Sequence, residues 1–232
     1  MKRLTVLFLF SYISLINCGG GPSQDLSGLL LLLGTGGPAN SFHCGQTVAN
    51  PVSFSGTTDG ATVADESGLI AALGGNNCET PSLTNNGNGT VTDSANRFMW
   101  TLCIIDGSAS PYKPHTYSNP NCGAFTGSDS SFNQAQGKSI CEALTFAGRS
   151  DWEMPDAIQT NSLRDTSSPY ALGVFGTTTK SLPEAQLIWS SSYVTGTVSY
   201  HAIFSRYASG AGFYSGDVNT TPQGAFICVA KL

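Results

Sequence analysis

Hydrophobic and polar positions divide the chain into segments of two kinds. Residues 4 to 15, LTVLFLFSYISL, are almost continuously apolar, and Leu29 to Leu33 form a shorter apolar block. From Asn85 onward, apolar residues instead alternate with polar ones in short stretches separated by Gly, Ser and Asn. Alternation with a period of two is typical of half-buried strands. The pattern predicts an N-terminal targeting region followed by a strand-rich domain.

Residues 133–148, NQAQGKSICEALTFAG, have the period of a helix. Their apolar residues fall on one face, and Gly148 suits a C-terminal cap. That face contains Ile140, Cys141, Leu144 and Ala147. A shorter helix is predicted in MPDAIQTNSL, where Asp156 and Gln159 have the spacing of a capping box.

Strand-like stretches surround these helices. In TVTDSANRFMW, Val91 and Met99 lie on two strands of a predicted hairpin, separated by the turn formers Asp93 to Asn96. Four later stretches also read as strands: LIWSSSYV, SYHAIFSRYA, GAGFYSG and GAFICVA. Two helices followed by a strand-rich half predict an α+β domain over residues 85–232. Residues 41–84 are rich in Gly, Thr and Ala and are predicted to form an N-terminal extension with a disulfide of its own.

The stretch NNGNGTVTDSANRFMW, residues 85–100, also imitates a calcium loop through its Asn, Gly and Asp spacing. Asp93 supplies its one carboxylate, which is too little anionic charge for calcium. The Asn-Gly pairs suit tight turns instead. We therefore predict a hairpin without a metal, with Trp100 in the core.

The first eighteen residues resemble a bacterial lipoprotein leader. Two basic residues precede the apolar block, which is too short to span a bilayer permanently. Leu15 stands three places before Cys18, similar to the looser lipobox of spirochaetal lipoproteins. In the alternatives, Cys18 is an ordinary leader residue or half of a disulfide. We expect a signal peptide over residues 1–17, lipidation of Cys18 and a Gly/Pro/Leu tether over 18–40.

The charge balance is acidic. The formal charge of -5 becomes -7 without the two basic leader residues, because no acidic residue precedes Cys18. We expect no nucleic-acid partner, since such partners require basic surfaces. Polyanionic polysaccharides are disfavoured for the same reason. Export also implies an oxidising compartment in which disulfides persist.

The cysteines divide into one plus six. With Cys18 acylated, an even set remains for disulfides. The set comprises Cys44, Cys78, Cys103, Cys122, Cys141 and Cys228. None of them forms the C-x-x-C pattern of a zinc or redox site. Three disulfides are the simplest interpretation, although the count itself leaves the pairing open.

Several motifs in the same order resemble the Lcl-C family, a bacterial domain of unknown function named after the C-terminal domain of a collagen-like adhesin. The motifs are NNGNGTVTDSANRFMW (85–100), CEALTFAGRSDWEMP (141–155), IWSSS (188–192) and FICVA (226–230). The resemblance covers residues 85–232. It implies a fold similar to C-type lectins and to formylglycine-generating enzymes.

The resemblance also implies a disulfide pairing. Folds of this kind tie the first helix to the last strand, and family members often close the insertion between Cys103 and Cys122, after the first motif, in the same way. The implied pairs are Cys141 with Cys228, Cys103 with Cys122 and, by what is left, Cys44 with Cys78. Closing the longest of these loops stabilises a fold by about 4 to 5 kcal/mol in the chain-entropy model.

The chain departs from the family pattern at several charged positions. Family members often carry Arg where this chain has Glu153, Ile227 and Ala230, and Asp where it has Asn85 and Asn88. The missing arginines remove forked donors suited to carboxylates and sulfates. The polyanion binding that the resemblance implies is therefore not expected here.

Two groups of residues are candidates for ligand binding. They are Trp189, Ser191 and Tyr193 on a predicted strand, and Tyr112, His115 and Tyr117 in the loop 104–121. The strand is hydroxyl-rich and either faces a ligand groove or is ordinary core and turn. The loop is either a recognition surface or solvated. The three histidines have no metal-pair spacing, so no metal and no cofactor is predicted.

Catalytic motifs are missing from the sequence. It contains no G-x-S-x-G elbow, H-E-x-x-H helix or phosphate-binding Gly loop, so we do not expect an enzyme. We expect a lipid-anchored protein of the outer membrane or cell surface. Its non-catalytic module would recognise a glycan or host matrix protein through loops 104–121 and 193–220. The alternatives are a structural envelope lipoprotein that self-associates through Leu29 to Leu33 and, third, a formylglycine-generating-like enzyme.

Overall fold

The computed structural model describes residues 44–45, 51–56, 61–168, 170–179, 181–183, 186–195, 200–207, 212–217 and 223–232. All of them belong to the unit Phe42–Leu232. The predicted leader, the lipidation site Cys18, the tether and Leu29 to Leu33 lie outside these residues. Within them, no helix combines the length and apolar character needed to cross a membrane.

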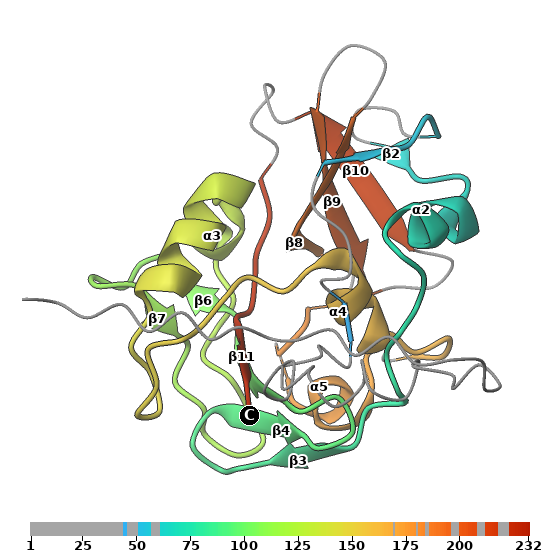
Figure 1. Cartoon of the computed structure of the whole chain (residues 1–232). Coiled ribbons are helices and arrows are strands. Elements are labelled where there is room, and N and C mark those ends of the chain that lie inside the picture. Colours follow the sequence, from blue (N-terminus) through green and yellow to red (C-terminus); the bar gives the residue numbers. More distant parts are fainter. Residues whose placement is uncertain are drawn as a thin grey trace, which may run out of the picture. The chain divides into compact units, whose positions relative to one another are not determined.

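A five-stranded sheet contains three long strands and two short ones (Figure 1). The strands are β1 (Val52–Ser53), β8 (Leu187–Thr195), β9 (Tyr200–Arg206), β10 (Phe213–Asp217) and β2 (Ala61–Thr62), in that spatial order. The three long strands pair antiparallel, whereas β1 pairs parallel with the end of β8. The strand-rich C-terminal half predicted from the alternating pattern is therefore confirmed.

A second sheet has four strands. They are β11 (Val229–Lys231), β5 (Phe98–Thr101), β4 (Thr90–Asp93) and β3 (Leu83–Asn85), in that order. The pairing of β4 with β5 is antiparallel and places Val91 opposite Trp100, so the predicted hairpin is confirmed. A separate two-stranded ladder joins β6 (Ile105–Asp106) to β7 (Lys113–Pro114).

Asp93 anchors the turn of this hairpin. Its buried carboxylate accepts hydrogen bonds from the backbone of Ser82 and Asn96, at 3.0 and 3.3 Å, and from the side-chain amide of Asn96 at 2.8 Å. A carboxylate with backbone donors on both sides of a turn fixes the chain reversal. The residue that imitates a calcium ligand in the sequence thus serves local turn geometry.

Four α-helices and one 3-10 helix complete the described elements. They are α2 (Glu66–Ala72), η1 (Gly127–Ser130), α3 (Gln134–Ala143), α4 (Ala157–Ser162) and α5 (Gly173–Thr177). The capping box predicted for α4 is present, because Asp156 accepts from the Gln159 amide and the Gln159 side chain accepts from the Asp156 amide. Mixed helices and sheets make the domain α+β, as predicted.

The end of α3 differs from its prediction. The helix stops at Ala143, and Leu144 already has extended backbone geometry. Ala147 (φ 51°) and Gly148 (φ 77°) instead form a tight turn, across which Phe146 and Arg149 exchange two backbone hydrogen bonds. Two consecutive residues with positive φ are typical of a hairpin turn. The prediction that Gly148 caps the helix was therefore wrong.

Three disulfides join the pairs implied by the family resemblance. They are Cys44–Cys78, Cys103–Cys122 and Cys141–Cys228. The third links α3 to the residue immediately before β11. Since β11 pairs with β5, this bond holds the helix against the end of the chain and the early hairpin.

The segment before residue 85 is built into the same unit. Strands β1 and β2 belong to the five-stranded sheet, and β3 belongs to the four-stranded one. The α2 residue Leu69 is buried in a cluster with Ile158 and Phe213. Residues 41–84 were expected as an N-terminal extension with a disulfide of its own, and their described strands and helix lie in the same compact unit as the residues from 85 onward.

Candidate functional site

Trp189 lies in the core. Its side chain is 1% exposed and packs in a cluster with Trp152 and Phe226. Its indole N–H donates to the Phe132 carbonyl at 2.7 Å. A ring enclosed in this way has no free face for a sugar, so the groove interpretation is corrected to a core position.

The serines that follow Trp189 connect β8 to two helices. The regular pairing of β8 with β9 is interrupted between Trp189 and Tyr193. In this interruption the Gln134 side chain of α3 donates to the carbonyls of Ser190 and Ser192, at 2.7 and 3.0 Å. The Ser192 hydroxyl accepts from the first amide of α4 at 3.0 Å. Interrupted pairing turns backbone groups away from the neighbouring strand. Here the groups of β8 bond to the first residues of α3 and α4.

Ser191 and Tyr193 share this structural environment. Both are half-buried, and the Ser191 amide donates to the Pro155 carbonyl at 2.8 Å. The hydroxyl-rich strand is therefore a docking strip for α3 and α4, and its candidate residues do not converge with Trp189 on one exposed surface.

The candidate residues of the loop 104–121 are also separated. Tyr112 is 45% exposed, with its ring edge-to-face against Phe132. Tyr117 is half-buried, and its hydroxyl accepts from the side-chain amide of Asn85 at 2.7 Å. His115 is buried, with 9% exposure. The loop thus presents one aromatic ring to solvent rather than a surface of His and Tyr side chains.

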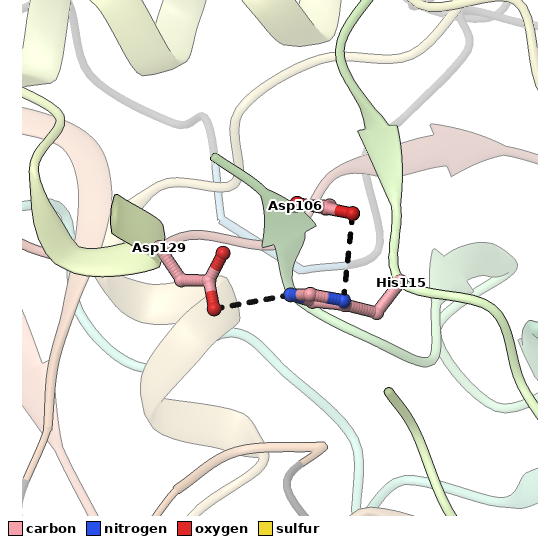
Figure 2. Close-up of side chains that lie close together, drawn as sticks. All are labelled: Asp106, His115 and Asp129. Atoms are coloured by element: carbon pink, nitrogen blue, oxygen red, sulfur yellow. Dashed lines mark ion pairs between the residues drawn. The ribbon is translucent and has the colours of Figure 1, made fainter. Parts of the chain in front are cut away.

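His115 lies between two carboxylates (Figure 2). Its Nε2 is 3.1 Å from Oδ2 of Asp129, and its Nδ1 is 3.7 Å from Oδ2 of Asp106. The Asp129 side chain is fully buried, whereas that of Asp106 is 20% exposed. Among the described residues, this is the one group of three or more His, Cys, Asp or Glu side chains close enough to share a metal ion.

Backbone pairing brings two of these residues, Asp106 and His115, together. Asp106 ends β6, and His115 follows β7, which is paired with β6. The His115 amide donates to the Ile104 carbonyl at 3.0 Å. The Cys103–Cys122 disulfide closes the loop behind them. The imidazole is therefore held by a ladder and by a covalent bond.

Asp129 is held by the N-terminus of η1. Its Oδ2 accepts from the Thr126 amide at 2.6 Å and the Thr126 hydroxyl at 3.1 Å, and its Oδ1 accepts from the Gly107 amide at 2.8 Å. These donors satisfy both oxygens of the carboxylate although the side chain is fully buried. The site therefore holds a buried acceptor group directly beside an imidazole.

Asp106 has a different environment. Its Oδ1 accepts from the hydroxyl and the amide of Ser108, at 2.6 and 2.8 Å. The hydrogen bond from the Ser108 hydroxyl, with weaker help from the nearby His115 and Lys113, lowers the pKa of Asp106 below its usual value against a modest burial penalty. The carboxylate is therefore anionic at neutral pH and keeps Oδ2 facing the imidazole.

Sequence reasoning identified His115 but missed both aspartates. The three positions follow no motif, because their proximity depends on the β6–β7 register and on the start of η1. The one available signal was the disulfide loop. It brings the segment of His115 back beside that of Asp106, and η1 follows shortly after the loop ends at Cys122. Each side chain offers a nitrogen or oxygen atom that can act as a metal ligand, so the group is suited to binding a cation.

Comparison of the chain with protein-family models, with curated proteins and with solved structures found no match. The resemblance to the Lcl-C family accordingly stays a prediction from the motifs.

Proposed function

We propose that the chain is an exported, lipid-anchored bacterial envelope protein whose domain is a non-catalytic binding module. The observation that carries the proposal is the use of the cysteines. Six of the seven form the three disulfides, and Cys18 at the lipobox is the seventh. Stable disulfides require an oxidising compartment, and acylation of Cys18 would give the membrane anchor.

The arrangement of α3, α4 and β11 supports a place in the Lcl-C family with a fold similar to C-type lectins. Such folds bring the C-terminal strand beside an early strand and tie the first helix to it. Here β11 pairs with β5, and Cys141 of α3 is bonded to Cys228. On this proposal the domain is a binding scaffold of the adhesin type, with a glycan or a host matrix protein as ligand.

The proposed contact surface is the tip of the disulfide loop around Tyr112. Among the described residues, Tyr112 and Leu232 are the exposed large hydrophobic side chains, at 45% and 47%. An exposed aromatic ring held by a ring contact to Phe132 is preorganised for stacking on a sugar or a peptide side chain. Leu232 offers a control of similar exposure far from the loop in sequence.

Ligand arrays test the binding module. The purified protein should give a signal on a glycan or matrix array, Tyr112→Ala should lose it, and Leu232→Ala should keep it. A truncated aromatic anchor commonly costs more than about 1 kcal/mol, or roughly fivefold in affinity. Equal loss from both variants, or no signal from the unmodified protein, would count against this function.

Metabolic labelling with a fatty acid tests the anchor. Labelled chain is expected in the membrane fraction, whereas Cys18→Ser should remove both the label and the membrane association. A Cys18→Ser variant that stays labelled would exclude this cysteine as the lipidation site.

A structural envelope lipoprotein is the second candidate, favoured by the small number of exposed large hydrophobics on the described surface. In this case the protein would self-associate through Leu29 to Leu33 and bind no soluble ligand. Proteolysis of intact cells separates the two, since a surface adhesin is cut and a periplasm-facing protein is protected.

A further inference from the structure

We propose that Nε2 of His115 and Oδ2 of Asp129, which face each other where the disulfide loop meets η1, bind a divalent transition-metal ion of the zinc type, with Asp106 positioning the imidazole. This inference is independent of what the module recognises. The two atoms lie 3.1 Å apart, and the His115 side chain is nine-tenths buried.

The first evidence is an unsatisfied nitrogen. Nε2 of His115 is buried and has no hydrogen-bond partner among the described residues, although the Asp129 oxygen lies at hydrogen-bonding distance. Buried polar atoms in folded proteins are nearly always satisfied by protein, water or an ion. A water molecule or an ion would satisfy this nitrogen.

The geometry distinguishes a metal ion from a proton. An N–H group must point nearly at its acceptor, and the bond weakens steeply below about 120°. Because the oxygen is close enough but forms no hydrogen bond, it lies out of line with Nε2. At metal–ligand distances of about 2.0 to 2.2 Å, two ligand atoms 3.1 Å apart subtend nearly a right angle at the ion. A metal ion on the lone pair of Nε2 would therefore have the Asp129 oxygen beside the Nε2–metal direction and not in line with it.

The surroundings fix the imidazole in the required orientation. Asp106 faces Nδ1 at 3.7 Å. With a metal ion at Nε2 the ring proton is on Nδ1, and a carboxylate on that side of the ring orients it. Gly123 also lies against this edge of the ring, since a Cβ at this position would come within 2.9 Å of Nδ1. Asp106 and Gly123 thus confine the ring from the side opposite Asp129.

The donor set selects the class of ion. One imidazole nitrogen and one carboxylate oxygen are typical ligands of zinc, whereas calcium and magnesium take oxygen ligands alone. Two protein ligands leave coordination positions for water, so the ion would be exchangeable rather than permanently enclosed. No catalytic step is assigned to it.

Equilibrium dialysis of the oxidised protein, stripped with EDTA and then exposed to Zn²⁺, tests the site. One zinc per chain is expected, together with a rise in the thermal midpoint that EDTA reverses. His115→Gln should abolish both effects while the chain remains folded. Asp129→Asn should also abolish them, but Asp129 caps η1, so His115→Gln is the decisive variant.

Two further variants separate positioning from general electrostatics. Asp106→Asn should weaken zinc binding about 10- to 100-fold and leave the metal-free thermal midpoint close to that of the unmodified protein. Asp151→Asn removes an exposed carboxylate outside the group and should bind zinc normally. Zinc binding by His115→Gln at full stoichiometry, equal binding of Ca²⁺ and Zn²⁺, or no bound zinc at all would overturn the proposal.

Discussion

Trp100 and Trp189 are equally buried but differ in their polar contacts. Trp189 donates its indole N–H to the Phe132 carbonyl, whereas the indole nitrogen of Trp100 is buried without a hydrogen-bond partner among the described residues. Trp100 packs edge-to-face against Phe98 and Phe175. Its contribution to stability is therefore apolar packing, while that of Trp189 includes a buried hydrogen bond.

Trp189→Phe is accordingly expected to cost more than Trp100→Phe. Both changes remove a similar volume, but only the first also removes a hydrogen bond, which contributes about 0.5 to 1.5 kcal/mol. Urea unfolding should show Trp189→Phe less stable than Trp100→Phe by about 1 to 2 kcal/mol. The reverse order would mean that the Trp189 hydrogen bond adds nothing to stability.

Single residues were predictable where their signals are local. Asp156 and Gln159 were identified from three-residue spacing, because a capping box is satisfied within one helical turn. The burial of Trp189 and the partners of His115 were not, since both depend on segments that are distant in the chain. Phe132, for example, reaches Trp189 across 57 positions.

At the scale of elements, β8 joins two helices to a sheet at the point where its regular pairing with β9 is interrupted. The carbonyls of Ser190 and Ser192 both accept from Gln134, the first residue of α3. These carbonyls belong to buried residues, so losing their shared donor is not compensated by bulk water. Gln134 is thus the polar link between α3 and the five-stranded sheet.

Gln134→Met should therefore destabilise the protein although it preserves the length of the side chain. We expect a loss of about 1 to 3 kcal/mol in the free energy of unfolding, from two hydrogen bonds of about 0.5 to 1.5 kcal/mol each. Lys138→Met on the same helix is the control, because its side chain is 63% exposed and should change stability by no more than about 0.5 kcal/mol. Equal effects of the two substitutions would exclude the proposed link.

Element types were easier to predict than their ends. Three of the four later stretches contain the long strands β8, β9 and β10, whereas in GAFICVA only Val229 and Ala230 belong to a strand, β11. The C-terminal cap of α3 was placed four residues too late, at Gly148 instead of Leu144, because apolar residues continue on one face while the backbone has already turned. Ala147 adopts a positive φ, which is uncommon for alanine and therefore could not be predicted from the residue type.

For the whole molecule, the three disulfides restrain loops of different length. Cys141 and Cys228 are 87 positions apart, whereas Cys103 and Cys122 are 19 apart. In the chain-entropy model the longer loop restricts the unfolded chain more strongly. The Cys141–Cys228 bond should therefore be the larger contributor to stability.

Replacing both cysteines of a pair by alanine tests this ranking. We expect losses of about 4 to 5 kcal/mol for Cys141 and Cys228, and of about 3 kcal/mol for Cys103 and Cys122, in the free energy of unfolding. Urea denaturation under oxidising conditions measures both. A larger loss from the shorter loop would show that packing around these sulfurs outweighs the entropy of the unfolded chain.

The pairing of β1 with β8 and of β2 with β10 has a consequence for aggregation through the sheet edges. Short stretches close together in sequence, β1 and β2, cover opposite edges of the five-stranded sheet, at β8 and β10. Open edges of long strands present unpaired N–H and C=O groups that recruit other molecules into aggregates. A fragment cut at Asn85 would expose both edges at once. The poorly patterned N-terminal segment thus protects the sheet edges from pairing with other copies of the chain.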